Sequence, residues 1–139
     1  MKKAVQGGCA CGEVRYECSG APVFVIYCHC RDCQRASGGA MGATVFFGKD
    51  DFRMLQGTSR SCVFTADSGN LIARHFCSTC GSPLFTDAKG YPGIWGVKIA
   101  SLDEPAAVEP GMHIWTDSAQ PWDHINDQLP RFPKSPPVD

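Results

Sequence analysis

The sequence lacks any long run of apolar residues. Its N-terminus carries Lys2 and Lys3, but the apolar stretch of roughly 7–15 residues that marks a secretory signal does not follow them. No segment approaches the roughly 20 apolar residues of a membrane-spanning helix. These absences predict a cytoplasmic protein that has no membrane partner and whose thiols stay reduced.

The sequence also lacks an excess of either sign of charge. The 139 residues include 13 basic and 14 acidic side chains, for a formal net charge of −1. Proteins that bind nucleic acid draw much of their affinity from a basic face. The balance therefore argues against nucleic acid as a partner, and a hydrophobic share of 43% argues against a disordered chain.

Helical periodicity is missing as well. No segment repeats apolar residues at helical spacing over the roughly 10–12 residues of a typical helix. Short alternating or β-branched segments predict strands at 13–18, 23–27, 43–47, 52–55, 61–66, 71–76, 84–86, 94–100 and 112–116. Residues 34–39 predict a loop or one helical turn, and 121–139 predict an extended, proline-rich tail. We expect a single all-β domain over residues 1–139, with little helix.

Cysteine, in contrast, is abundant. Seven of the nine cysteines form three groups, which are an N-terminal pair (Cys9, Cys11), a triple (Cys28, Cys30, Cys33) and a later pair (Cys77, Cys80). An odd total in a reducing compartment favours metal binding or catalysis over a disulfide framework. In extended chain, Cys-x-Cys spacing puts two sulfurs on one side, and Cys-x2-Cys brings two together in a turn. Gly12 and Gly81 follow two of these cysteines and suit turns that need a positive φ.

The sizes of these groups predict two zinc ions per chain. The N-terminal pair and the later pair together form a four-cysteine cluster, which is a closed site of the structural kind. The triple leaves a fourth coordination position open, as catalytic zinc sites do. An alternative joins the N-terminal pair to part of the triple, but it leaves the later pair without partners.

Other interpretations exist for individual cysteines. Cys18 and Cys62 each lie in a predicted strand and fit the role of small buried apolar side chains. The Cys-x2-Cys segments are also compatible with redox pairs, although no βαβ pattern surrounds either of them.

Several segments resemble the glutathione-dependent formaldehyde-activating enzyme (GFA) family. They are GGCACGEVRY at 7–16, YCHCRDCQRASGG at 27–39, FCSTCGSPLF at 76–85 and, similar to that family's C-terminal part, PWDHINDQLPRF at 121–132. The resemblance extends over nearly the whole chain. It implies a zinc-pinned β-tent fold and the same two-zinc scheme.

The activity that the resemblance implies is that of a carbon–sulfur lyase, which interconverts S-(hydroxymethyl)glutathione with glutathione and formaldehyde. This chain is shorter than the family's glutathione-using archetype, and short relatives form a broad group whose substrates need not be glutathione. We therefore expect a small-molecule thiol, or its adduct with an aldehyde, as the partner. An open zinc position suits such chemistry, because zinc deprotonates a bound thiol.

Basic and imidazole side chains lie beside the cysteine motifs. Arg31, Arg35 and Arg74 are candidates either to offset the thiolate charges or to bind a carboxylate of the substrate. His29 lies between two cysteines of the triple, and strand alternation turns it away from the metal. His113 is a candidate for the pocket wall or for packing.

Two further functions remain open at this point. One is a protein-binding module in which both zinc ions are structural, and the other is zinc storage or sensing. A binding module needs no open coordination position, so the triple separates it from an enzyme. Seven thiolates and two zinc ions would take the formal charge from −1 to about −4, which argues further against nucleic acid.

Overall fold

The structure, a computed structural model, describes residues 4–136. Its strands are β1 Val5–Gly8, β2 Arg15–Cys18, β3 Phe24–Cys28, β4 Gly42–Gly48, β5 Phe52–Gln56, β6 Ser59–Thr65, β7 Leu71–Cys77, β8 Pro83–Ala88, β9 Ile94–Lys98 and β10 Met112–Ile114. Its helices are α1 Arg31–Ser37 and four short 3-10 helices, Lys49–Asp51, Ile99–Ser101, Pro105–Ala107 and Thr116–Ser118. This mostly-β architecture confirms the predicted fold class.

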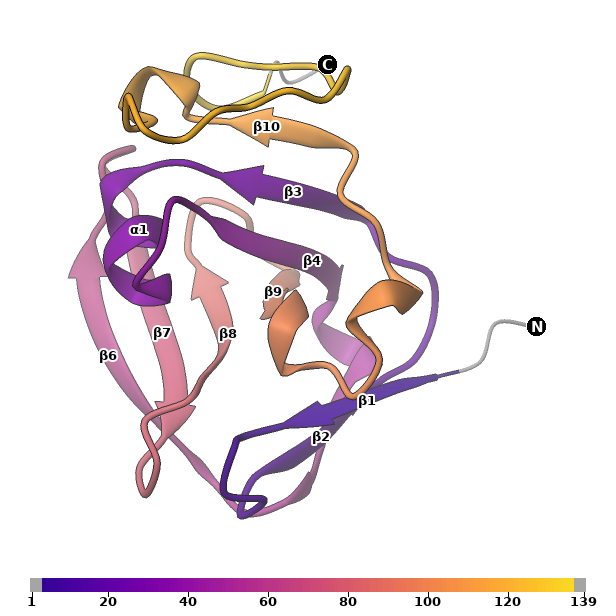
Figure 1. Ribbon diagram of the computed structural model, residues 1–139. Coiled ribbons are helices and arrows are strands. Elements are labelled where there is room, and N and C mark those ends of the chain that lie inside the picture. The colour runs from indigo at the N-terminus through magenta and orange to yellow at the C-terminus, as the bar shows by residue number, and fades with distance from the viewer. Residues whose placement is uncertain (1–3, 137–139) are drawn as a thin grey trace.

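The strands form two sheets. The small sheet has the order β1-β2-β5, and the large sheet has the order β10-β3-β4-β9-β8-β7-β6. Neighbouring strands are antiparallel throughout, except that β10 runs parallel to β3. Figure 1 shows the large sheet bending around the molecule, with the small sheet across its lower end.

The main core joins side chains from both sheets. Tyr16 of β2, Phe47 of β4, Leu84 of β8 and Val97 of β9 are almost fully buried there. Gly7 of β1 lies against this core, where a Cβ atom would collide with the Tyr16 ring. The close approach of the β1 backbone therefore depends on a glycine, a residue that normally disfavours strands.

Several predicted elements and boundaries differ from the structure, and three of them bear on the sites described below. No strand is predicted at 5–8, yet β1 pairs with β2, because cross-strand pairing outweighs the low strand propensity of two glycines. The loop or single turn predicted at 34–39 is replaced by α1, which begins at Arg31 and ends where Gly38 adopts a φ of 73°. The strand predicted at 94–100 stops at Lys98, where a 3-10 helix begins.

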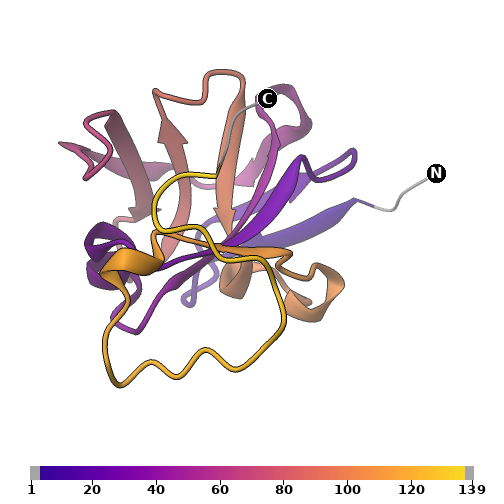
Figure 2. The same cartoon turned by 90° about the horizontal axis from the view of Figure 1, so that it is seen from above.

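The segment after residue 120 runs along the edge of the large sheet. Residues 121–136 contain no helix or strand, and they loop past β10 (Figure 2). The His113 N–H donates to the Pro130 carbonyl at 2.9 Å, and the Phe132 N–H donates to the His113 carbonyl at 2.9 Å. The predicted tail is thus bonded to the sheet, and its last residues, 137–139, lie outside the described residues.

Residues 4–136 contain no helix with the length and apolar character that crossing a membrane requires.

Candidate metal centres and the adjoining cavity

The structure brings the four-cysteine cluster together from segments that lie far apart in the sequence. All four sulfur atoms lie within 4.8 Å of one another. The Cys9 and Cys11 sulfurs are 3.5 Å apart, and those of Cys11 and Cys77 are 3.8 Å apart. A tetrahedral site with zinc–sulfur bonds of about 2.3 Å has sulfur–sulfur edges of about 3.8 Å. The cluster therefore has the dimensions of a four-thiolate zinc site.

Two turns build this cluster at the lower end of the molecule, where the β1–β2 and β7–β8 connections approach each other (Figure 1). Gly12 and Gly81 have φ values of 80° and 77°, which confirms the turn geometry that the sequence predicts. The Cys-x-Cys pair converges in a turn rather than in the extended chain assumed from its spacing, since the Gly12 N–H donates to the Cys9 carbonyl at 3.2 Å. The Val14 N–H also donates to the Cys9 sulfur at 3.2 Å, which stabilises negative charge there.

The triple is built where β3 passes into α1. Cys28 ends β3, Cys30 is the N-cap of α1, and Cys33 lies in the first turn of that helix. Their sulfur atoms lie within 4.8 Å of one another, and the Cys33 N–H donates to the Cys30 sulfur at 3.3 Å. Within residues 4–136, no further His, Cys, Asp or Glu joins all three sulfurs at that distance. The triple thus offers three protein ligands.

The charges around the triple favour a thiolate at Cys33. Hydrogen bonds from Cys28 and Cys30 lower the pKa of Cys33 to about 2, and the positive charges of Lys98 and Arg74 act in the same direction. A Cβ atom added at Gly42 would lie 3.6 Å from the Cys33 sulfur and 3.8 Å from the Lys98 Nζ. The ammonium group and the sulfur therefore lie on the same side of Gly42, which has no side chain to separate them.

A cavity of about 120 Å³ adjoins the triple. Of the three arginines that the sequence singles out, only Arg74 lines it. Arg31 and Arg35 lie exposed on α1, and the Arg31 guanidinium donates to the Gln34 side chain at 2.5 Å. Lys98 lines the cavity too, and the sequence analysis missed it. Lys98 is the one charged residue of strand β9, and this is the sequence signal by which it could have been found.

Two histidines connect the triple's segment to the C-terminal segment. The His29 Nδ1 lies 3.1 Å from an Asp123 oxygen, and its Nε2 lies 2.8 Å from the His113 Nδ1. The His113 Nε2 lies 2.9 Å from an Asp127 oxygen. Both histidines are buried, and burial lowers the pKa of His29. The His29 ring therefore faces these groups, as strand alternation predicts, and the bonds hold residues 123–127 against the sheet.

The two remaining cysteines have different surroundings. Cys18 is buried, and burial raises its pKa to about 12, which fits the packing role expected from the sequence. Cys62 is exposed on β6, so the burial expected for it is wrong. Strand β6 lies at the edge of the large sheet, which leaves its Cys62 side chain uncovered.

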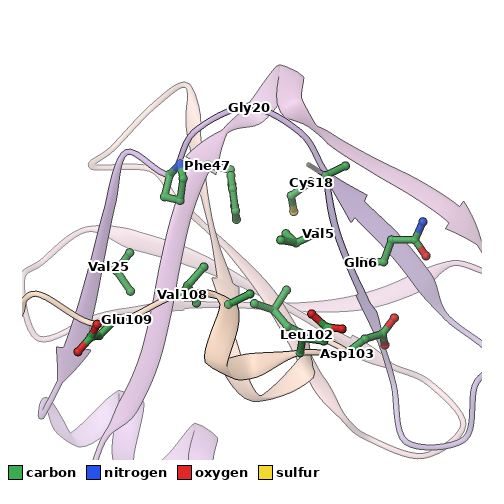
Figure 3. Close-up of a pocket in the computed structure, with 14 residues that line it drawn as sticks. Val5, Gln6, Cys18, Gly20, Val25, Phe47, Leu102, Asp103, Val108 and Glu109 are labelled. Carbon is green, nitrogen blue, oxygen red and sulfur yellow. The ribbon is translucent and has the colours of Figure 1, made fainter. Parts of the chain in front are cut away.

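A larger cavity than the one beside the triple lies away from both clusters. It has a volume of about 670 Å³, and none of the seven clustered cysteines lines it. Figure 3 shows Val5, Val25, Phe47 and Val108 around it, with the Glu109 carboxylate among its polar groups. Lacking a group that activates a thiol, this cavity does not supply the chemistry predicted from the sequence.

Comparisons with known proteins agree with the cysteine geometry. Residues 4–118 match the family described as glutathione-dependent formaldehyde-activating enzyme. A protein of Halomonas elongata that is named for the same enzyme is 26% identical over an alignment of 129 residues, and the match covers 89% of this chain and 82% of that protein. A crystal structure of a Rhodobacter sphaeroides protein has a TM-score of 0.57 and 23% identity, over 76% of this chain and 91% of that chain. The last comparison supports the fold alone.

Proposed function

This chain belongs to the glutathione-dependent formaldehyde-activating enzyme family, and on that premise we propose that it is a zinc-dependent carbon–sulfur lyase of the cytoplasm. Its substrate is the adduct of a thiol and an aldehyde, such as S-(hydroxymethyl)glutathione or the adduct of a related thiol. In the forward reaction the carbon–sulfur bond breaks and its electron pair goes to sulfur. The hydroxyl group of the adduct loses its proton to solvent as the carbonyl forms. In the reverse reaction the thiolate adds to the aldehyde carbon, and the resulting alkoxide takes up a proton from solvent.

The donor sets of the two clusters fit two zinc ions with different roles. The four-cysteine cluster would fill every position of a tetrahedral ion, which is the structural arrangement. The triple would hold the second ion with three thiolates. When bound there, zinc supplies positive charge that stabilises a thiolate sulfur beside it.

The chain's own residues supply the remaining charge. Three thiolates with one divalent cation leave one negative charge, and a substrate thiolate adds a second. Lys98 and Arg74 place two positive charges beside Cys33 and so offset both. The neighbouring Ile26, Ile114 and Trp115 place apolar groups beside these charges, and a less polar environment strengthens their interactions.

One observation carries the proposal, namely that the triple has three sulfurs and borders a cavity. A binding module with two structural ions would need a fourth protein ligand there. Instead, the space next to the three sulfurs is hollow and is flanked by cationic side chains. This arrangement suits a site that receives a sulfur atom from a ligand.

The test combines metal analysis with turnover. Protein purified under reducing conditions should contain two zinc ions and should release formaldehyde from S-(hydroxymethyl)glutathione or another thiol–formaldehyde adduct. Cys28→Ser should abolish turnover and remove one zinc ion, and Cys62→Ser should change neither, because Cys62 is an exposed cysteine outside both clusters. Two zinc ions without turnover of any adduct would move the function to a structural module.

A further inference from the structure

We infer that this site accepts a compact, uncharged apolar thiol in preference to glutathione. The inference rests on the lyase function proposed above and narrows its substrate class. Four observations support it, namely the size of the cavity, the chemistry of its walls, the use of its cationic side chains to neutralise the sulfurs, and the conformation of Trp115.

The first argument is size. The cavity beside the triple has a volume of about 120 Å³. Pockets that enclose drug-sized ligands measure roughly 300–1,000 Å³. Glutathione is a tripeptide of that size class, so only a fraction of it fits beside the three sulfurs. A thiol with a short carbon chain or a small ring matches the space.

The second argument is the chemistry of the walls. Apolar side chains from several elements line the cavity, among them Ile26 of β3, Phe46 of β4, Ile72 of β7 and Ile114 of β10. Such walls gain free energy when they enclose apolar groups. Polar side chains such as Thr44 and Thr86 also line the cavity, but most of its surface is apolar, and burying peptide groups against apolar surface is unfavourable. The cavity therefore selects for a hydrocarbon substituent on the sulfur.

The third argument is the use of the cations. Arg74 and Lys98 are the cationic side chains that line the cavity, and both act on Cys33. The Arg74 guanidinium also lies 4.9 Å from the centre of the Phe64 ring. Because these two positive charges already neutralise the sulfurs, neither is left to bind a carboxylate of the substrate. The negative charge of Asp67, which lines the same cavity, also repels a carboxylate. Glutathione carries two carboxylates, and both would compete with the thiolates for the same cations.

The fourth argument is the conformation of Trp115, whose side chain also lines the cavity. Its φ of 57° makes it the one non-glycine residue with a positive φ among residues 4–136. A bulky residue adopts that conformation only where its surroundings impose it. The Trp115 N–H donates to the Lys134 carbonyl at 3.0 Å, and the Trp115 carbonyl accepts from the Ser118 N–H at 3.1 Å. These bonds fix the backbone of Trp115 at the edge of the cavity, which makes Trp115 a specificity-determining residue.

Binding of matched thiols to the zinc-loaded protein tests the inference. Calorimetry would compare butane-1-thiol, its carboxylate-bearing counterpart 3-mercaptopropionate, and glutathione. We expect butane-1-thiol to bind more tightly than either, by about tenfold for every two methylene groups that the cavity encloses. Turnover of the three formaldehyde adducts should follow the same order.

A pair of tryptophan variants locates the effect. Trp115→Ala should weaken the binding of butane-1-thiol and reduce its preference over glutathione. Trp122→Ala should leave the preference unchanged, because Trp122 is 62% exposed, lies on the same C-terminal segment and does not line the cavity. The wild-type comparison decides the inference even where Trp115→Ala fails to fold.

The outcomes separate the two claims. If glutathione binds as tightly as butane-1-thiol and its adduct is turned over as fast, the inference is wrong while the lyase function stands. If no thiol binds to the zinc-loaded protein and no adduct is turned over, the lyase function itself is wrong.

Discussion

The four-cysteine cluster and the triple should contribute very unequally to stability, and Cys77→Ala compared with Cys33→Ala measures the difference. A metal at the four-cysteine cluster joins residues that are 66 positions apart, Cys11 and Cys77. A crosslink that closes a loop of this length is worth about 4 kcal/mol in chain-entropy terms. The triple spans only five positions, from Cys28 to Cys33, and a crosslink over that length is worth about 2 kcal/mol.

The difference of about 2 kcal/mol translates into a melting temperature. With an unfolding entropy of about 2.1 cal/mol/K per residue, it corresponds to about 7 °C for a chain of 139 residues. Cys77→Ala should therefore melt at least about 7 °C below Cys33→Ala. The four-cysteine cluster also ties the small sheet to β7, and losing that contact increases the gap.

Thermal unfolding followed by circular dichroism, with zinc content measured on the same samples, is the assay. Titration of the wild-type protein with a chelator gives a second measurement that needs no variant. Loss of the zinc at the triple should shift the melting temperature little, and loss of the zinc at the four-cysteine cluster should shift it strongly, whichever ion the chelator removes first. Equal melting temperatures for the two variants, or equal shifts for the two zinc ions, would refute the division into a structural and a catalytic site.

Three further predictions address other parts of the molecule. Burial raises the pKa of Cys18 from 9.0 to about 12. The contribution of the buried thiol to the free energy of unfolding should therefore be complete below pH 9 and should be lost as the pH rises toward 12. Urea titrations at several pH values should show a smaller loss for Cys18→Ala. Gly42→Ala should weaken zinc binding at the triple but not at the four-cysteine cluster, because the added Cβ would lie 3.3 Å from the Cys33 Cβ. Metal analysis measures this, and Gly39→Ala is the matched control, because its added Cβ would meet only the Ser37 Oγ, at 3.8 Å. Asp127→Asn should speed amide hydrogen exchange at Phe132, because the carboxylate bonded to His113 helps hold the C-terminal segment. An unchanged exchange rate would show that this hydrogen bond does not stabilise the segment.

The fold class and the grouping of the cysteines could be predicted from the sequence, because the signals are local. Turn glycines, β-branched segments and Cys-x2-Cys spacing act over a few residues, so the local conformation that each favours does not depend on how the rest of the chain folds. Gly12 and Gly81 illustrate this, since a turn of that kind needs a positive φ whatever surrounds it. Even there, the spacing of Cys9 and Cys11 did not show that the pair lies in a turn.

Long-range contacts account for what the sequence left undecided. Arg31, Arg35 and Arg74 look equivalent along the chain, but only Arg74 lies on a strand that faces the cavity. Lys98 approaches Cys33 because β4 pairs with β9, and no local pattern encodes that pairing.

The two histidines show the same division between local and long-range information. Strand alternation turns His29 away from the triple, but the partners it meets come from β10 and the C-terminal segment. Local spacing therefore determined the cysteine pairs and the triple, because ligand groups a few residues apart stay together in any fold, whereas the union of the two pairs into one cluster depends on tertiary structure. The packing of β4, β7, β9 and β10 decided the shape and charge of the space beside the metal site, because those side chains meet only when distant strands pair.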